Sequence, residues 1–114
     1  MLPLRFPISL SLVTALTVAG SAALAADLTP LGKWMKPNMG APMAGQDFAT
    51  LQKSLELVAG STPSPDYPQW AAIAKAGAAA AAKQDVAGVK AACKQCHDPY
   101  KAKYKKEFPT RQFP

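Results

Sequence analysis

The chain has 114 residues, with 13 lysines and arginines against 7 acidic residues and a formal net charge of +6 at pH 7. This length suits a single small domain. The positive charge alone does not indicate nucleic-acid binding, because no recognition motif of that class is present. Beyond residue 25, no segment approaches the roughly 18 consecutive apolar residues of a membrane helix, so we expect no membrane span in the rest of the chain.

Residues 1–25 have the three-part layout of a secretory signal peptide. Arg5 is the only charge before an apolar run over residues 8–19, and Ala23-Leu24-Ala25 forms an A-x-A cleavage site. The run is short for a bilayer span, and an uncleaved amino-terminal anchor is the alternative interpretation. We expect cleavage after Ala25, export to the periplasm, and a mature domain over residues 26–114.

The remainder of the chain is expected to be all-α. Apolar residues recur at three- and four-residue spacing, alanine is abundant and no run alternates with period two. The first predicted helix spans residues 30–44, with Thr29 as its cap and Pro30 at its first position. Pro37 and Pro42 lie inside it, which predicts a kink or a break.

The second predicted helix begins at Asp47, a good N-cap, and ends near Gly60. Residues 61–68 contain three prolines and are expected to form a loop. The third helix is predicted to start at Pro68, and its alanines at 78–82 allow a neighbouring helix to approach closely. The predicted buried positions of these two helices are Phe48, Leu51, Leu55, Val58, Trp70, Ile73, Ala74 and Gly77.

The fourth predicted helix is capped by Asp85. Pro99 inside it points to a restart of the helix there, with Asp98 as the new cap, rather than a smooth continuation. The tail after Pro109 is expected to fray. Four short helices with short connections predict a small antiparallel four-helix bundle. The predicted inward face of the last helix is Val86, Val89, Cys93, Cys96, His97, Tyr100, Tyr104 and Phe108.

Residues 93–97 form a C-x-x-C-H motif, the attachment sequence of c-type haem. The thiols of Cys93 and Cys96 can add to the two vinyl groups on one edge of the porphyrin, and His97 can then place its imidazole beneath the iron. The chain has two cysteines and one histidine, all within this motif. The motif therefore predicts one covalent haem c, with Cys93 and Cys96 as attachment residues and His97 as the proximal iron ligand.

Other interpretations of these residues are weaker. A structural zinc site needs about four ligands, usually Cys and His, and only three such residues exist here. A thioredoxin-like dithiol lies at the start of a helix within a βαβ unit, and no such unit is visible. A disulfide between Cys93 and Cys96 would close almost no loop and add little stability.

Only 17 residues follow His97, and none of them is methionine. The motif thus lies on the last predicted helix, with Tyr100 and Lys101 as an aromatic and a basic residue behind it. In this layout the chain resembles the class II c-type cytochromes, the cytochrome c-prime superfamily. The resemblance implies a four-helix bundle with haem attached on the last helix. The chain is shorter than typical members, and Pro99 departs from their pattern.

The resemblance also implies two alternatives for the distal side of the iron. One branch is five-coordinate and binds nitric oxide or other small gases, whereas the low-spin branch uses a methionine of the first helix and transfers electrons. Trp34-Met35-Lys36 is similar to the ligand context of the low-spin branch. Met35 is therefore the preferred distal ligand, Met39 the alternative and Met43 the third choice. Flexible core packing is the ordinary explanation for such a methionine stripe.

Three aromatic residues, Trp34, Trp70 and Tyr100, are candidate haem contacts, with core packing as the alternative for the tryptophans. A basic cluster follows the motif and is expected to attract an acidic redox partner, although a solvated helical face is the plain alternative. The cluster consists of Lys101, Lys103, Lys105, Lys106 and Arg111.

The sequence as a whole predicts an exported mono-haem cytochrome that acts in periplasmic electron transfer. The alternative is a five-coordinate haem protein that binds small gases. We do not expect an enzyme, because no distal histidine is available as an acid–base catalyst.

Overall fold

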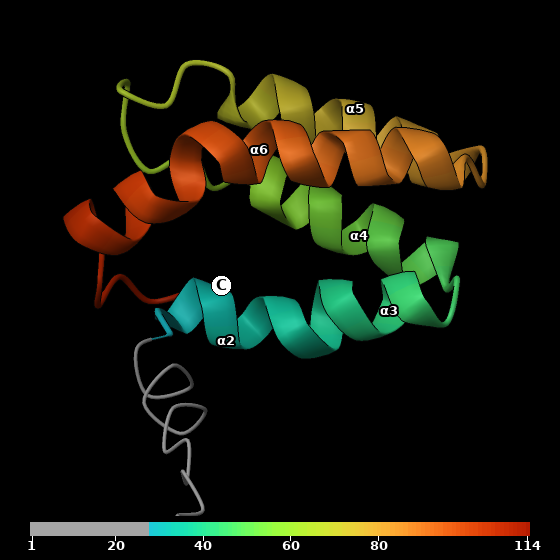
Figure 1. Ribbon diagram of the computed structural model, residues 1–114, viewed down its shortest axis with the longest axis horizontal. Helices are drawn as coiled ribbons and strands as arrows, with labels where there is room; N and C mark the ends of the chain where they lie inside the picture. The colour runs from blue at the N-terminus through green and yellow to red at the C-terminus, as the bar shows by residue number, and fades with distance from the viewer. Residues whose placement is uncertain (1–27) are drawn as a thin grey trace, which may run out of the picture.

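The computed structural model describes residues 28–114, so the predicted signal peptide, residues 1–25, lies outside the described residues. The described part is all-helical and contains no strand, as predicted. Residues 30–44 form one unbroken run, here called the first helical run, so there are four helical rods in this part of the chain (Figure 1). The elements are α2 (Pro30–Met35), the π-helical turn η1 (Lys36–Gly40), α3 (Ala41–Ala44), α4 (Phe48–Ala59), α5 (Trp70–Ala82) and α6 (Val86–Glu107).

Local capping explains where three of the four rods begin. The side chains of Thr29, Asp47 and Asp85 each accept a hydrogen bond from the backbone N–H three residues later, at 3.0, 3.2 and 3.0 Å. Each bond satisfies one of the N–H groups that a helix start leaves without a partner. The predicted starts of the first, second and fourth helices are confirmed, whereas α5 begins at Trp70, two residues later than predicted.

The first helical run accommodates Pro37 and Pro42 by widening. Each proline removes one backbone donor, and its ring presses on the carbonyl four residues earlier. At η1 the Ala41 N–H instead reaches back five residues to the Lys36 carbonyl, the spacing of a π-helix. The Asn38 amide donates to a backbone carbonyl four residues earlier, at 2.8 Å. The run is therefore continuous through both prolines: of the predicted kink or break, the break is absent, and the helix is distorted locally into the π-helical turn.

The predicted restart of the last helix at Pro99 is wrong. Helix α6 runs from Val86 to Glu107 with Pro99 in its interior. Pro99 and Gln95, whose carbonyl loses its helical donor, are both exposed. Water can hydrate that carbonyl, so the lost hydrogen bond costs little and Asp98 is not needed as a cap.

Small residues let α4, α5 and α6 approach closely. A Cβ atom on Gly77 of α5 would lie 2.9 Å from the Ala92 Cβ of α6 and 3.2 Å from the Leu55 Cδ1 of α4. Gly77 therefore marks the point where the three helices meet, and its predicted burial is confirmed. Ala78 and Ala81 are buried beside it, in agreement with the close approach predicted for the alanine run.

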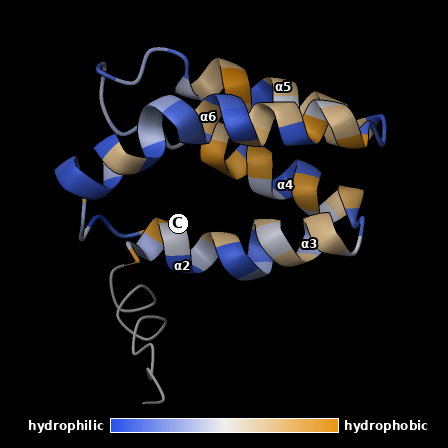
Figure 2. Cartoon of the chain, in the orientation of Figure 1, coloured by the Kyte–Doolittle hydropathy of each residue, from blue (hydrophilic) through white to orange (hydrophobic). Residues whose placement is uncertain are grey.

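The first helical run contacts α4 through η1 and α3. Helix α4 packs against α5, and α5 packs against α6. In Figure 1, α6 begins at the end of the molecule where α3 lies and finishes at the end where α2 lies. Apolar residues concentrate on α4 and α5, and hydrophilic residues on the second half of α6 (Figure 2). No helix of the described residues is both long and apolar enough to span a membrane.

The carboxyl-terminal tail packs, so the expectation that it frays is wrong. The Phe113 ring meets the Trp34 ring edge-on, with 4.7 Å between centroids. The Arg111 guanidinium donates to the Ser61 carbonyl at 3.1 Å. Both contacts join residues far apart in the sequence, and no local pattern indicates them.

Candidate functional site

A cavity of about 1100 Å³ lies between the first helical run and the other three helices. Its size slightly exceeds the roughly 300–1,000 Å³ that ligand sites usually occupy. Most of its lining is apolar and comes from all four rods: Leu31, Met35, Met39 and Met43 from the first run, Leu51, Leu55 and Val58 from α4, Trp70, Ile73 and Ala74 from α5, and Ala92, Cys93, Cys96, Tyr100 and Tyr104 from α6.

The cavity brings together most of the side chains singled out from the sequence. Cys93, Cys96 and His97 line the α6 wall, and Met35 and Met39 line the opposite wall. Trp70 and Tyr100, two of the candidate haem contacts, also line it.

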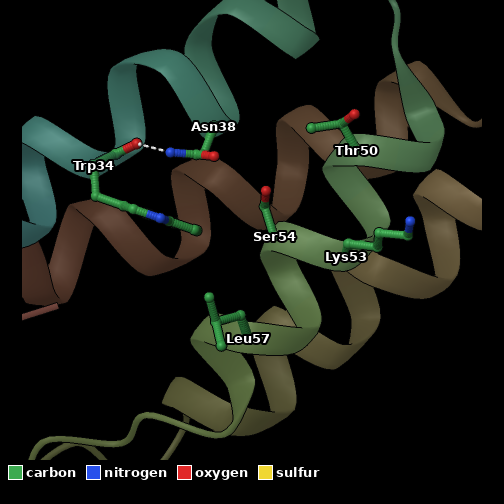
Figure 3. A pocket seen from close by; sticks show the side chains of 6 residues that line it. All are labelled: Trp34, Asn38, Thr50, Lys53, Ser54 and Leu57. Carbon is green, nitrogen blue, oxygen red and sulfur yellow. Dashed lines mark hydrogen bonds between the residues drawn. The ribbon is translucent and has the colours of Figure 1, made fainter. Parts of the chain in front are cut away.

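Trp34 is the predicted contact that the structure does not bring to this cavity. It lines a separate pocket of about 270 Å³ between the first helical run and α4, together with Asn38, Thr50, Lys53, Ser54 and Leu57 (Figure 3). Trp34 and Met35 are successive residues of one helix, so their side chains leave it in directions about 100° apart. Met35 faces the large cavity, and Trp34 instead packs on Phe113.

The two thiols are half-buried and free. Burial raises the pKa of Cys93, and burial followed by the charge of Cys93 raises the pKa of Cys96 to about 11. Both sulfurs are therefore neutral thiols at pH 7. A dithiol redox catalyst works as a thiolate with a lowered pKa, so this environment does not suit one.

Burial, and then the positive charge of Lys101, lower the pKa of His97 below its ordinary value, with Asp98 opposing them. The imidazole is therefore mainly neutral at pH 7 and has a ring nitrogen lone pair to offer a metal. A closed zinc site is not formed around it. Among residues 28–114, no group of three or more His, Cys, Asp or Glu side chains gathers as metal ligands would.

The methionines and the motif follow a regular order across the cavity. Met35 and Met39 pack against the same apolar cluster as Cys96. Met43 packs against a second cluster, which Cys93 also contacts. Later residues of the first run thus lie opposite earlier residues of α6. His97 directly follows Cys96, so this order favours Met35 and Met39 over Met43 as the methionines that face it.

The widened turn η1 contributes to this alignment. In a regular α-helix, residues spaced by four drift about 40° around the axis at each step. A π-helical turn holds more residues than an α-helical turn, so four residues make less than one full turn there. From Met35 to Met39 the side-chain direction therefore rotates in the opposite sense and offsets this drift. All three methionines consequently line the cavity, although two prolines lie between the first and the last of them.

Four residues of the predicted basic cluster divide into two pairs, and the fifth, Lys106, is exposed and does not line the cavity. Lys101 and Lys105 line the cavity, and Lys36 joins them from the first helical run. The Lys103 ammonium instead donates to the Asp66 carbonyl at 2.5 Å and lies 4.4 Å from the centroid of the Tyr67 ring. Lys103, like Arg111, therefore fastens the loop before α5 to the carboxyl-terminal part of the chain.

Sequence reasoning missed the role of Tyr67. This residue lies in the loop before α5, yet it is 1% exposed and its ring meets those of four other aromatic residues. Its hydroxyl donates to Glu107 at 2.9 Å. A proline-rich loop carries no periodic signal, so only the folded arrangement reveals this centre of the aromatic cluster.

Tyr104 was expected on the inward face but without a role. It is 4% exposed and lines the cavity. Its hydroxyl is the one buried side-chain polar atom of residues 28–114 that has no hydrogen-bond partner.

Comparisons with models of protein families, with curated proteins and with solved structures find no match to this chain.

Proposed function

We propose that this chain is an exported mono-haem c-type cytochrome that transfers electrons in the periplasm. The observation that carries the proposal is the arrangement of one cavity. Two neutral thiols and an imidazole, spaced as C-x-x-C-H, line one wall of an apolar space, and methionines line the wall opposite. In the proposed fold, an antiparallel four-helix bundle holds haem c between the first helical run and α6.

The side chains around the cavity fit such a group. Cys93 and Cys96 are free, as attachment requires. Each S–H can add across a vinyl C=C, so that a carbon–sulfur bond forms, the hydrogen goes to the other vinyl carbon and nothing is released. Leu51, Leu55 and Val58 offer an apolar surface to a flat macrocycle.

His97 would supply the proximal nitrogen, because its environment keeps the imidazole neutral. On the other wall, Met35 would supply the distal thioether, with Met39 as the alternative. The bound haem would supply a metal centre that gains and loses one electron. Thioether ligation opposite histidine is one means by which proteins raise the potential of such a centre.

The remaining lining supports electron transfer over catalysis. The first helical run offers methionine, leucine and glycine to the cavity, and Lys36 is its only ionisable residue there. That wall offers no histidine or carboxylate side chain that could act as a general base. Lys36, Lys101 and Lys105 place positive charge beside the cavity and would attract an acidic redox partner.

The test is to produce the full-length chain in a bacterial host that attaches c-type haem. We expect a mature protein that starts at Ala26 and carries one haem that acid–acetone does not extract. The double variant Cys93→Ala/Cys96→Ala should lose this covalent haem. The control Lys94→Ala/Gln95→Ala changes the exposed residues between the thiols and should keep it. Wild-type protein without covalent haem would overturn the proposal.

Carbon monoxide then tests the distal side. A ferrous spectrum that carbon monoxide leaves unchanged would support a methionine ligand and electron transfer. Rapid formation of a carbon monoxide complex would replace electron transfer with the binding of small gases.

A further inference from the structure

The two ends of the first helical run are held differently. At its carboxyl end, the turn at residues 45–47 leads directly into α4, and the Asp47 N–H donates to the Pro42 carbonyl at 2.8 Å. At its amino end, no Cα atom of α2 lies within 8 Å of a Cα atom of α4, α5 or α6. Leu31 is the one buried residue of α2, and η1 has none, whereas α4 and α5 bury five residues each. The α2 end is therefore the weakly held end of the run.

The carboxyl-terminal tail, residues 109–114, reaches this weakly held end. Figure 1 shows the chain crossing from the end of α6 to α2, where the carboxyl terminus lies. There the Phe113 ring meets the Trp34 ring edge-on, with 4.7 Å between centroids. Two residues earlier in the tail, the Arg111 guanidinium donates to the Ser61 carbonyl, in the loop that follows α4. The tail thus joins α2 to the carboxyl ends of α4 and α6.

From these contacts we infer that the tail controls how far α2 can move away from the other helices. When the contact between Phe113 and Trp34 is lost, the first helical run can swing outward about the turn at residues 45–47. Met35 lies on α2 and lines the cavity, so the same movement withdraws Met35 and widens the space in front of His97. The consequence for Met35 and an iron rests on the proposed function, whereas the fastening of α2 does not.

A run released in this way also loses its helical structure. Helices shorter than about 12–15 residues are marginal in water on their own. Pro37 and Pro42 each remove a backbone donor from this run, which weakens it further. Amides of a released run therefore exchange their hydrogen with solvent, and the exchange rate measures how often release occurs.

Hydrogen–deuterium exchange of the mature protein tests the fastening. Phe113→Ala removes the ring that packs on Trp34, and amides of residues 30–40 should exchange about two- to tenfold faster, the factor that an aromatic pair typically contributes. Amides of α5 should keep their rate. Gln112→Ala is the matched control, because this exposed neighbour bonds only within the tail, to the Thr110 carbonyl. It should leave both rates unchanged.

A second variant, Arg111→Ala, covers the case in which Phe113→Ala fails to fold. It releases the tail from Ser61 and should accelerate exchange over the same residues. Faster exchange over residues 30–40 without a change in α5 supports the inference. Unchanged exchange, or an equal increase in all helices, would overturn it.

Imidazole binding to the ferric, haem-loaded protein tests the consequence for the cavity. Because imidazole has to displace Met35, Phe113→Ala should bind it faster by a factor similar to that seen in exchange, and Gln112→Ala should not. Faster exchange without faster binding would overturn the control of access to the cavity. Wild-type protein that carries no haem would overturn the cytochrome proposal, and exchange alone would then decide the role of the tail.

Discussion

The Tyr100 hydroxyl accepts a hydrogen bond from the Gln69 backbone N–H, across 31 positions of sequence. Tyr100 lies on α6, three residues after His97, and Gln69 immediately precedes α5. The bond therefore ties the turn that carries the proposed iron ligand to the start of the neighbouring helix. One wall of the cavity is held in place by contacts within the protein itself.

Replacing Tyr100 by phenylalanine should weaken this wall. The change leaves the Gln69 N–H without its acceptor, and because the bond is only partly buried we expect a loss of about 1 kcal/mol in the free energy of unfolding. Urea unfolding of the haem-loaded protein measures it. Lys101→Ala, on the next and exposed position, should change stability by less than about 0.5 kcal/mol. Equal stabilities for the two variants would show that the bond does not contribute.

Gly77 should not tolerate a side chain. Alanine normally stabilises a helix by about 0.5–1 kcal/mol relative to glycine. Here its Cβ would lie 2.9 Å from the Ala92 Cβ, so the close packing of three helices would have to open. We expect Gly77→Ala to lower the free energy of unfolding by about 1–3 kcal/mol.

Gly40 provides the matched control for Gly77, because no atom lies within 4 Å of a Cβ built on it. Gly40→Ala should therefore leave the stability unchanged or raise it in thermal unfolding. If both glycines responded alike, helix propensity rather than packing would determine the effect.

Tyr67 should make the protein sensitive to alkali. Burial, and then its hydrogen bond to Glu107, raise the pKa of Tyr67 from 10.0 to about 12. The folded state thus favours the neutral phenol more than the unfolded state does. This contribution to stability is complete below about pH 10 and is lost as the pH rises through about 12. Urea unfolding over this range should show a decline that is smaller in Tyr67→Phe. An identical decline in the variant would assign it to other groups.

The sequence predicts those features of this fold that depend on neighbouring residues. Thr29, Asp47 and Asp85 cap helices through bonds that span three positions, so their pattern is visible in the sequence. The cost of Pro99 depends on which side of α6 faces water, and the sequence does not show this. Long-range packing likewise decides which way Trp34 faces.

The candidate site divides in the same way. The C-x-x-C-H spacing identifies Cys93, Cys96 and His97 without any structure. The partners of a buried hydroxyl depend on residues from several helices, so the sequence could place Tyr104 on the inward face but could not reveal that its hydroxyl lacks a partner.

The distal ligand is the most discriminating prediction for the proposed cytochrome. Met35 lines the wall opposite His97 and packs against the same apolar cluster as Cys96. Under the proposed function, Met35→Ala should remove the thioether, produce a high-spin ferric spectrum, lower the potential and open the iron to carbon monoxide. Met39→Ala and Met43→Ala are the matched controls and should mainly loosen packing, with a loss in the free energy of unfolding of at most the roughly 2–5 kcal/mol of a buried methionine.

Absorption spectra of the three variants show which methionine, if any, binds the iron. A spin change in Met39→Ala alone would mean that the widened turn η1 brings Met39 to the iron instead. A wild-type protein that is already high-spin would assign no ligand to either methionine and favour gas binding.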